Sequence, residues 1–319
     1  MIRAMRRVLA ALILLAQAFA AGAEYPERPV RLVVPFVAGG SIDRVARLLA
    51  ERLQNSIGQA VIVDNRTGAT GNVGTQAVVT APPDGHTLLM QTSALAISPW
   101  LSKLPFDVEA DLVPVTRIAR TPYALVARKS LPVDTLDAFL AYAAAHPGKL
   151  TCSSYGVGSP PHLALELIKQ AAKLDIVHAP YRSFSQAVPS LVSGQVDCSI
   201  DTLTNVQPQL EAGVVRLLGV TAAEPFQLFP DAVPIAQHLP GTELEGFQLL
   251  FVAKGTPPAI VERIHAEFAR ALRDPEIERQ LRSMGFVPVG DDPTSAAEGF
   301  KKDYERFGKL IGDRGIRAE

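Results

Sequence analysis

The feature that most constrains the fold of this chain is a repeated alternation of short β-branched runs with amphipathic helical runs. The first cycle has strand-like segments at residues 31–36, 60–65 and 87–92. After the first of them, residues 43–57 place Val45, Leu49 and Leu53 on one face of a helix that Gly58 ends. Strands that alternate with helices in this way favour parallel sheets covered by helices.

A second cycle of the same kind follows. Its strand-like segments are 122–128, 150–154, 175–181 and 195–201, followed by a strand at 214–221, a returning strand at 247–255 and a mostly helical remainder. Two βαβαβ units joined by two extended segments predict a two-lobed α/β protein whose chain crosses between the lobes twice. The predicted division is a leader at 1–23, lobe one at 24–123, lobe two at 124–243, and a return to lobe one at 244–319.

The first 23 residues have the pattern of a secretory signal peptide. A basic start with three arginines precedes an apolar stretch over residues 8–20. At about 13 residues this stretch is shorter than the ~20 that a membrane span needs. Small residues allow cleavage after Ala20 or Ala23. The mature chain is therefore expected in the periplasm.

The charge balance argues against nucleic-acid binding. Loss of the three leader arginines lowers Lys+Arg from 31 to 28 against 32 Asp+Glu, so the formal charge moves from −1 to −4. Nucleic-acid-binding domains carry a basic surplus instead. The 6 histidines form no H-x-H or H-E-x-x-H pair, and C-x-x-C is absent. Neither a metal site nor a cofactor is predicted.

Cys152 and Cys198 each lie in a strand-like run of a chain that we expect to be exported. We predict that both are buried free thiols. A disulfide between them is the alternative, because its geometric requirement cannot be tested on a sequence.

The first candidate site is the loop FVAGGSID, residues 36–43, which follows a predicted strand and opens a helix. Open α/β sheets bind ligands at such strand ends. Gly39 and Gly40 permit close backbone approach, and N–H groups at a helix start attract anions. Asp43 is expected to cap the helix and organise the loop. Without a lysine, a metal ligand or a paired base, the loop is a binding candidate rather than a catalytic one.

The second candidate site is the loop SSYGVGSPPH, residues 153–162. Gly156 and Gly158 match two thirds of the dinucleotide fingerprint, but Pro161 takes the third glycine position and no acid ends the next strand. An NAD site is therefore disfavoured, and the G-x-S-x-G pattern of a hydrolase is absent. His162 either points into a cleft or hydrogen-bonds to its own loop; both remain open.

The sequence resembles the Bug/TctC proteins, the periplasmic substrate-binding receptors of tripartite tricarboxylate transporters. The likeness covers essentially the whole mature chain and includes the segments VVPFVAGGSIDRVARLLAERL, GVGSPPHLALEL, VHAPYRSFSQAVPSLVSGQVD and KGTPPAIVERIHAEFARALRDPEI. It implies a type II periplasmic-binding fold with a ligand cleft between two α/β lobes. It further implies a receptor, not an enzyme, that passes a small carboxylate (a di- or tricarboxylate, an acidic amino acid or an aromatic acid) to membrane permease subunits. We expect a monomer.

Carried onto this sequence, the resemblance predicts a carboxylate held mainly by backbone amides and water between two facing loops. The predicted ligand-binding residues are Phe36, Val37, Ala38, Gly39, Gly40, Ser41, Ile42, Asp43, Thr92 and Ser93 in lobe one, and Ser154, Tyr155, Gly156, Gly158, Ser159, His162, Tyr181, Asp201, Thr202 and Asn205 in lobe two.

Two departures from the family pattern bear on the ligand. Ala38 stands where the family usually has Pro, and Ile42 stands where it often has Thr. The missing hydroxyl at position 42 predicts a more apolar or differently seated ligand. Two other functions remain open at this point: a receptor that signals through a sensor kinase, and a secreted enzyme that uses the same cleft.

Overall fold

The structure, a computed structural model, describes residues 25–181, 183–224, 229–230 and 232–317. The predicted leader and its cleavage sites lie outside the described residues. The strands are β1 (Val30–Val34), β2 (Val61–Asn65), β3 (Thr87–Thr92), β4 (Leu112–Arg128), β5 (Thr151–Ser154), β6 (Val177–Pro180), β7 (Cys198–Thr202), β8 (Val215–Val220), β9 (Glu245–Ala253) and β10 (Val287–Pro288). The α-helices are α2 (Ser41–Ile57), α3 (Asn72–Val79), α4 (Ala94–Leu101), α5 (Leu136–Ala145), α6 (Pro160–Ala172), α7 (Phe184–Val192), α8 (Leu203–Glu211), α9 (Pro258–Leu272), α10 (Pro275–Ser283) and α11 (Pro293–Arg314).

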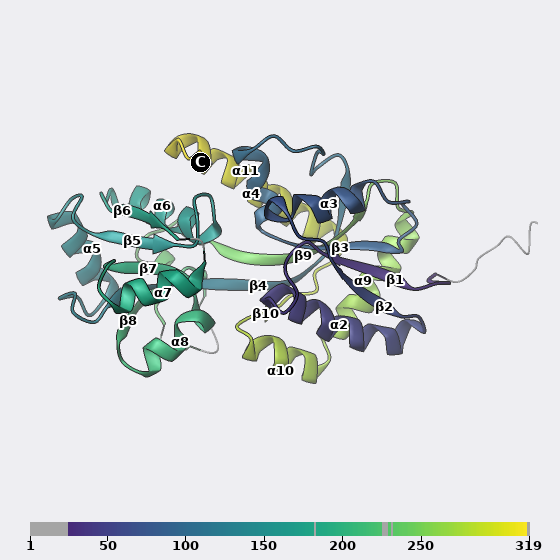
Figure 1. The fold of residues 1–319 in the computed structure, drawn as a ribbon, viewed down its shortest axis with the longest axis horizontal. Coiled ribbons are helices and arrows are strands. Elements are labelled where there is room, and N and C mark those ends of the chain that lie inside the picture. Colours follow the sequence, from purple (N-terminus) through teal and green to yellow (C-terminus); the bar gives the residue numbers. More distant parts are fainter. Residues whose placement is uncertain (1–24, 182, 225–228, 231, 318–319) are drawn as a thin grey trace, which may run out of the picture.

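The strands form two sheets that share the long strand β4. In the first sheet β2, β1 and β3 are parallel, β9 pairs antiparallel with β3, and the first half of β4 pairs antiparallel with β9. In the second sheet β6, β5 and β7 are parallel, and the second half of β4 pairs antiparallel with β7 and β8. β4 leaves the first sheet at Pro122 and enters the second at Tyr123. Figure 1 shows two bodies joined by β4 and β9, which we call lobe one (first sheet) and lobe two (second sheet).

The two-lobed α/β fold predicted from the sequence is confirmed, and the residue limits of the lobes stay a prediction. β4 is much longer than the predicted strand at 122–128. Its first half contains Pro114 and two register shifts, which break the alternation that marks a strand. The helices α4 and α8 were not predicted, because each is short and contains an internal proline, Pro99 or Pro208.

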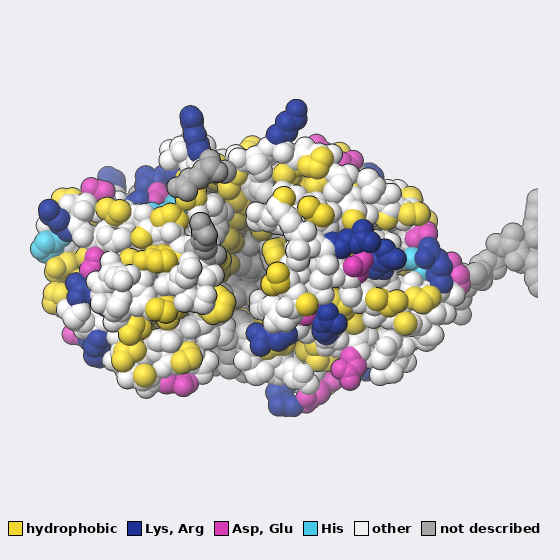
Figure 2. All heavy atoms as spheres, in the orientation of Figure 1, with side chains coloured by type: hydrophobic (Ala, Val, Ile, Leu, Met, Phe, Trp, Pro, Cys, Tyr) yellow, Lys and Arg dark blue, Asp and Glu magenta, His cyan; other side chains and the backbone are white. Residues whose placement is uncertain are grey.

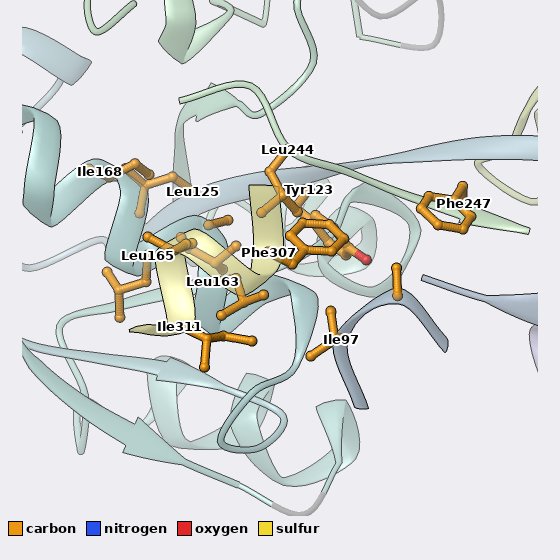
Figure 3. Packing of buried hydrophobic residues seen from close by; sticks show 14 of the residues in the cluster. Ile97, Tyr123, Leu125, Leu163, Leu165, Ile168, Leu244, Phe247, Phe307 and Ile311 are labelled. Atoms are coloured by element: carbon orange, nitrogen blue, oxygen red, sulfur yellow. The ribbon is translucent and has the colours of Figure 1, made fainter. Parts of the chain in front are cut away.

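The largest apolar cluster runs through both lobes rather than stopping at their junction. Figure 3 shows Phe307 and Ile311 of α11 close to Leu163 and Leu165 of α6, with Tyr123 of the crossing strand beside them. A second cluster fills the space between the first sheet and α2, α9 and α10. A third cluster lies on the other face of the second sheet, against α7 and α8. The junction of the lobes is therefore part of the core.

The C-terminal helix α11 is a further connection between the lobes. It packs on β4 and α4 and, farther along, on α6 of lobe two. Near its end, Nε of Arg314 donates to Oε2 of Glu166 at 2.6 Å. Glu166 is 5% exposed and accepts a second hydrogen bond, from Nζ of Lys169 at 2.5 Å. The two lobes are therefore linked by contacts to a buried carboxylate as well as by two strands.

Cys152 and Cys198 are buried free thiols, as predicted. They are register partners on the neighbouring strands β5 and β7. Burial raises the pKa of the Cys198 thiol well above its usual value. Since the thiolate is the reactive form, this thiol should be inert in the native protein.

Within the described ranges, no helix has both the length and the apolar character needed to cross a membrane.

We predict that Phe307→Ala destabilises the whole protein. Phe307 is 2% exposed in the cluster that both lobes share. Its removal should cost about 3–5 kcal/mol of the free energy of unfolding, because an aromatic cavity is left in the core. Calorimetry should show one unfolding transition at a lower temperature. Lys309→Ala on the exposed side of the same helix is the control, and two separate transitions in either protein would contradict a shared core.

Candidate functional site

A hollow separates the two lobes on the face shown in Figure 2. The lobes touch at two points beside it. A Cβ on Gly158 would lie 2.1 Å from Cδ1 of Leu101, so the second loop abuts α4. A Cβ on Gly285 would lie 2.4 Å from Cγ2 of Thr204, so the loop before β10 abuts α8. The carboxyl ends of strands from both lobes are thus close to the junction, where α/β sheets bind ligands.

The loop after β1 is shaped by its own hydrogen bonds. The N–H of Gly40 donates to the carbonyl of Val37 at 3.3 Å, and the N–H of Gly39 donates to Oδ2 of Asp43 at 2.8 Å. Gly39 has a φ of +80°, which favours glycine. Gly40 is the N-cap of α2, so the helix begins at Ser41, two residues before the predicted start. The glycines shape this loop, and both of their N–H groups are used within it.

Asp43 organises the loop from inside the helix, not from the N-cap position. It is 1% exposed, and it accepts hydrogen bonds from Nε of Arg47 at 3.0 Å and from Nδ2 of Asn65 at 2.9 Å as well as from Gly39. Burial alone would raise the pKa of Asp43, but these hydrogen bonds hold the pKa below its usual value. The carboxylate is therefore ionised, with Arg47 paired against its charge.

The N–H groups of Ala38, Ser41 and Ile42 have no hydrogen-bond partner within the described part of the chain. Those of Ser41 and Ile42 belong to the first turn of α2, where no intrahelical acceptor exists and the helix dipole adds partial positive charge. The side chain of Ile42 is 5% exposed and packs in the core below α2. Ile42 can thus offer an amide only, and the predicted effect of its missing hydroxyl on the ligand does not follow.

The rest of the lobe-one loop is more open. The side chain of Phe36 is half-buried against the core, whereas Val37 is 67% exposed at the tip of the loop. Val37 is therefore an apolar surface beside the free amides.

The loop before α6 has few backbone donors, which the sequence interpretation overlooked. Pro160 and Pro161 are the first two residues of the helix and have no N–H. The N–H of His162 donates to Oγ of Ser159 at 3.4 Å, and the N–H of Gly158 donates to Nδ1 of His162 at 3.0 Å. Within the described residues, the amides of Tyr155, Gly156 and Val157 in this loop lack an acceptor, whereas the first turn of α6 offers no free amide.

His162 takes the second of its two predicted roles and hydrogen-bonds to its own loop. It is 6% exposed and stacks on His178 with ring centroids 3.8 Å apart. Nε2 of His178 pairs with Oγ of buried Ser154 at 2.7 Å. Burial lowers the pKa of His162 to about 4, and burial together with the neighbouring imidazole lowers the pKa of His178 to about 4. Both rings are therefore neutral near pH 7. An unprotonated Nδ1 of His162 can accept the hydrogen bond from the N–H of Gly158.

Tyr123 is a residue of the junction that the sequence interpretation missed. It is 4% exposed, and its hydroxyl hydrogen-bonds to Tyr155 of the second loop and to Ser93 at the end of β3. A Cβ on Gly246 would lie 2.3 Å from this hydroxyl, so the tyrosine lies against the second crossing strand, β9. The signal was available: Tyr123 is the second residue of the strand predicted at 122–128, at the crossing into lobe two.

Asp201 ends β7 and is completely buried. Its Oδ1 accepts from Nδ2 of Asn205 and from the N–H of Thr202, both at 2.7 Å. Its Oδ2 has no hydrogen-bond partner among the described residues. Burial raises the pKa of Asp201 to about 6, although both hydrogen bonds act in the opposite direction. The charge of Asp201 also raises the pKa of Tyr155, so these groups are close.

The remaining predicted site residues fix the loops. Oγ1 of Thr92 accepts from the N–H of Ala94 at 3.3 Å, and the N–H of Ser93 donates to the carbonyl of Phe247. The N–H of Tyr181 donates to the carbonyl of Ser154. Across the described residues, no group of three or more His, Cys, Asp or Glu could hold a metal ion.

This chain matches one family of transport receptors along most of its length. Residues 45–316 match the family described as "Tripartite tricarboxylate transporter family receptor". A protein from the tcbD–tcbE intergenic region of a Pseudomonas species is 37% identical, over 98% of this chain and 95% of its own. BugT of Bordetella pertussis is 32% identical, over 92% of each chain.

Solved structures agree with these relatives. R. palustris Rpa4515 with adipate has a TM-score of 0.79 and 33% identity, and it covers 93% of this chain and 100% of its own. MatC from Rhodopseudomonas palustris with bound malate has a TM-score of 0.72 and 31% identity, covering 90% and 100%. The periplasmic binding protein BugD has a TM-score of 0.75 and 28% identity, covering 92% and 100%.

The stacked histidines predict acid sensitivity. An unfolded histidine titrates near pH ~6.5, whereas His162 and His178 titrate at about 4 in the folded protein. The unfolded chain therefore binds more protons between these values, and the free energy of unfolding should fall as pH is lowered through this window. Urea unfolding across pH 4–7 should show a shallower slope for His178→Gln. The exposed His146→Gln should keep the original slope, and a flat profile in the unchanged protein would refute the prediction.

Proposed function

Because this chain belongs to the tripartite tricarboxylate transporter receptor family, we propose that it captures a small carboxylate between its lobes and delivers it to a transporter permease. Members of this family are periplasmic solute-binding receptors, so the chain is a binding protein and not an enzyme. The proposal includes export by the leader at 1–23, with cleavage after Ala20 or Ala23, and action as a monomer.

The observation that carries the proposal is the set of unpaired amides at the start of α2. Ala38, Ser41 and Ile42 offer N–H groups without acceptors, next to an exposed loop tip. Such a helix start binds carboxylates through hydrogen bonds and the helix dipole. Asp43 does not oppose this, because its carboxylate is buried and paired with Arg47. Two related receptors solved with adipate and malate support the same ligand chemistry.

In the proposed mechanism the acid binds lobe one first, and lobe two then closes over it. Closure is a hinge motion about β4 and β9, with lobe limits at residues 123/124 and 243/244, and it is favoured only by the ligand's preference for the closed form. On the lobe-two side, the amides of Gly156 and Val157 face a second carboxylate or ordered water. The unpaired Oδ2 of Asp201 accepts a hydrogen bond from a ligand hydroxyl or amino group, or from water.

We predict that small carboxylates stabilise the exported protein against heat. Micromolar binding corresponds to about −8 kcal/mol, and ligand at 100 times Kd adds about 2.7 kcal/mol to the free energy of unfolding. A thermal-shift screen with di- and tricarboxylates, acidic amino acids and aromatic acids should raise Tm by several degrees for the correct class. Neutral sugars and cationic amino acids serve as controls. If only these controls raise Tm, the proposed function is wrong.

A single backbone donor can be tested with Ser41→Pro. Proline is tolerated at the first helical position, and the extended conformation of Gly40 (φ −66°, ψ 168°) suits the residue before proline. The variant therefore removes one N–H group while keeping the helix. A hydrogen bond to a charged group contributes about 1.5–3 kcal/mol, so calorimetric Kd should rise at least about tenfold.

The matched variant Ser41→Ala keeps the N–H group and loses only the exposed hydroxyl, so its Kd should stay within about threefold of the original. Equal affinity of Ser41→Pro and the original protein would show that this amide does not contact the ligand.

A further inference from the structure

A second depression lies on lobe one, on the face of the first sheet that carries α3. It has a volume of about 440 Å³ and is lined by the start of β1 and β3, by the edge strand β2 and by α3. The polar side chains that line it include Arg28, Arg31, Arg66, Asp84 and His86. Figure 2 shows Lys and Arg side chains gathered on the lobe-one surface, with acidic side chains between them and a histidine at the edge. The candidate ligand loops take no part in this depression.

The depression exists because one face of the first sheet is incompletely covered. Val30, Leu32 and Val34 of β1 point into the core below α2, so Arg31 and Val33 lie on the other face. That face is covered by α3, which is 8 residues long and packs on β1 and β3. On β2, Ile62 is left 53% exposed. Parallel sheets normally have both faces covered, so this edge is open to a further element.

The charges around the depression do not cancel locally. NH2 of Arg28 lies 2.7 Å from Asp84, and Nε of Arg66 lies 2.9 Å from Asp64. Arg31 has only a distant contact, at 3.8 Å, with the same Asp64 oxygen that Arg66 already holds. Arg28 and Arg66 therefore each hold a carboxylate at hydrogen-bond distance, whereas Arg31 has none that close among the described residues. The three arginine side chains are 40–54% exposed, so they can reach a partner.

A buried histidine in the same wall has an unsatisfied nitrogen. His86 is 3% exposed, packs edge-on against Tyr25 and places Nδ1 3.2 Å from the carbonyl of Asp84. Its Nε2 makes no hydrogen bond within the described residues; the carboxylate of Glu27 is 3.5 Å away. Buried polar atoms are rarely left unpaired. This is a second, independent sign that the wall is completed by another molecule.

We propose that this depression on lobe one, rimmed by Arg28, Arg31 and Arg66 beside the exposed Ile62, is the docking site for an acidic segment of the membrane permease. The proposal rests on the proposed function, because it presumes delivery to a permease. Planar guanidinium groups bind carboxylates in a bidentate way, and Ile62 offers an apolar contact between them.

A peptide segment fits this surface better than a free anion or a lipid surface. Single exposed ion pairs contribute little, so one free carboxylate would bind weakly, whereas a segment engages several arginines at once. The acids Asp64, Asp84 and Glu27 alternate with the arginines and would repel a uniformly anionic membrane. A folded segment can place its own charges to match this alternation.

The test uses the double charge reversal Arg31→Glu/Arg66→Glu in the full mature protein. The matched control is Arg279→Glu/Lys309→Glu, which makes the same change in net charge at two other ion pairs. The side chains of Arg279 and Lys309 are 72% and 76% exposed. Each protein is tested by biolayer interferometry against the purified permease in nanodiscs, and against empty nanodiscs of the same anionic lipids. Ligand affinity of each variant is measured by calorimetry with the acid that gives the largest thermal shift.

We expect the Arg31/Arg66 variant to bind permease nanodiscs at least tenfold more weakly, with unchanged Tm and ligand affinity, and the control to bind normally. Equal loss in both variants, or no loss in either, would overturn the docking site. Loss of binding to empty nanodiscs as well would assign the depression to lipid headgroups instead. If no carboxylate binds the unchanged protein, the proposed function is wrong. The binding of the variants to permease nanodiscs still tests the docking site in that case.

Discussion

The hydrogen-bond ladder of β4 is the interaction on which the rest of the structure depends. One 17-residue strand pairs with β9 in the first sheet and with β7 and β8 in the second, so two sheets are built on one backbone. Because both ladders start from the same strand, the carboxyl ends of the parallel strands in each lobe meet near the crossing. The position of the cleft follows from this pairing, and so does the place of Tyr123 between the loops of the two lobes. The apolar cluster continues through the junction, so the crossing is part of the core.

The two sides of the cleft differ in which of their backbone N–H groups are free to bind a ligand. In the loop of lobe one, the glycine amides are consumed by Val37 and Asp43, and the amides of the first helical turn stay free. In the loop of lobe two, the prolines remove two amides, and His162 and Ser159 accept from two more. The amides of Tyr155, Gly156 and Val157 have no acceptor among the described residues. A neutral imidazole is essential to this arrangement, because only an unprotonated Nδ1 can accept from Gly158. The first turn of α2 thus offers free donors, whereas the first turn of α6 offers none among the described residues.

Periodicity and resemblance predicted the fold class, the two crossings and the free thiols, and the assignment of the two ligand loops stays a prediction. They could not predict the outcome of competition for single hydrogen bonds. Ile42 was judged by its side chain, yet burial of that side chain leaves only its amide available. Pro160 and Pro161 were visible in the sequence, but their effect depends on the helix starting at Pro160. Tyr123 looked like an ordinary strand residue, and only the three-dimensional crossing of β4 and β9 brings its hydroxyl to Ser93 and Tyr155. The first half of β4 was hidden by a proline and two bulges.

The two prolines that open α6 have a kinetic consequence for the proposed mechanism. In the proposed mechanism, an acid that enters the open cleft meets free first-turn amides on α2, whereas the first turn of α6 offers none among the described residues, so we expect lobe one to contribute more to capture. Lobe two contributes when it swings shut, and its loop then limits how long the ligand stays. Arrival and residence time are therefore under the control of different segments of the chain. Evolution can alter the release of the cargo through residues 154–162 without disturbing its capture by residues 36–43.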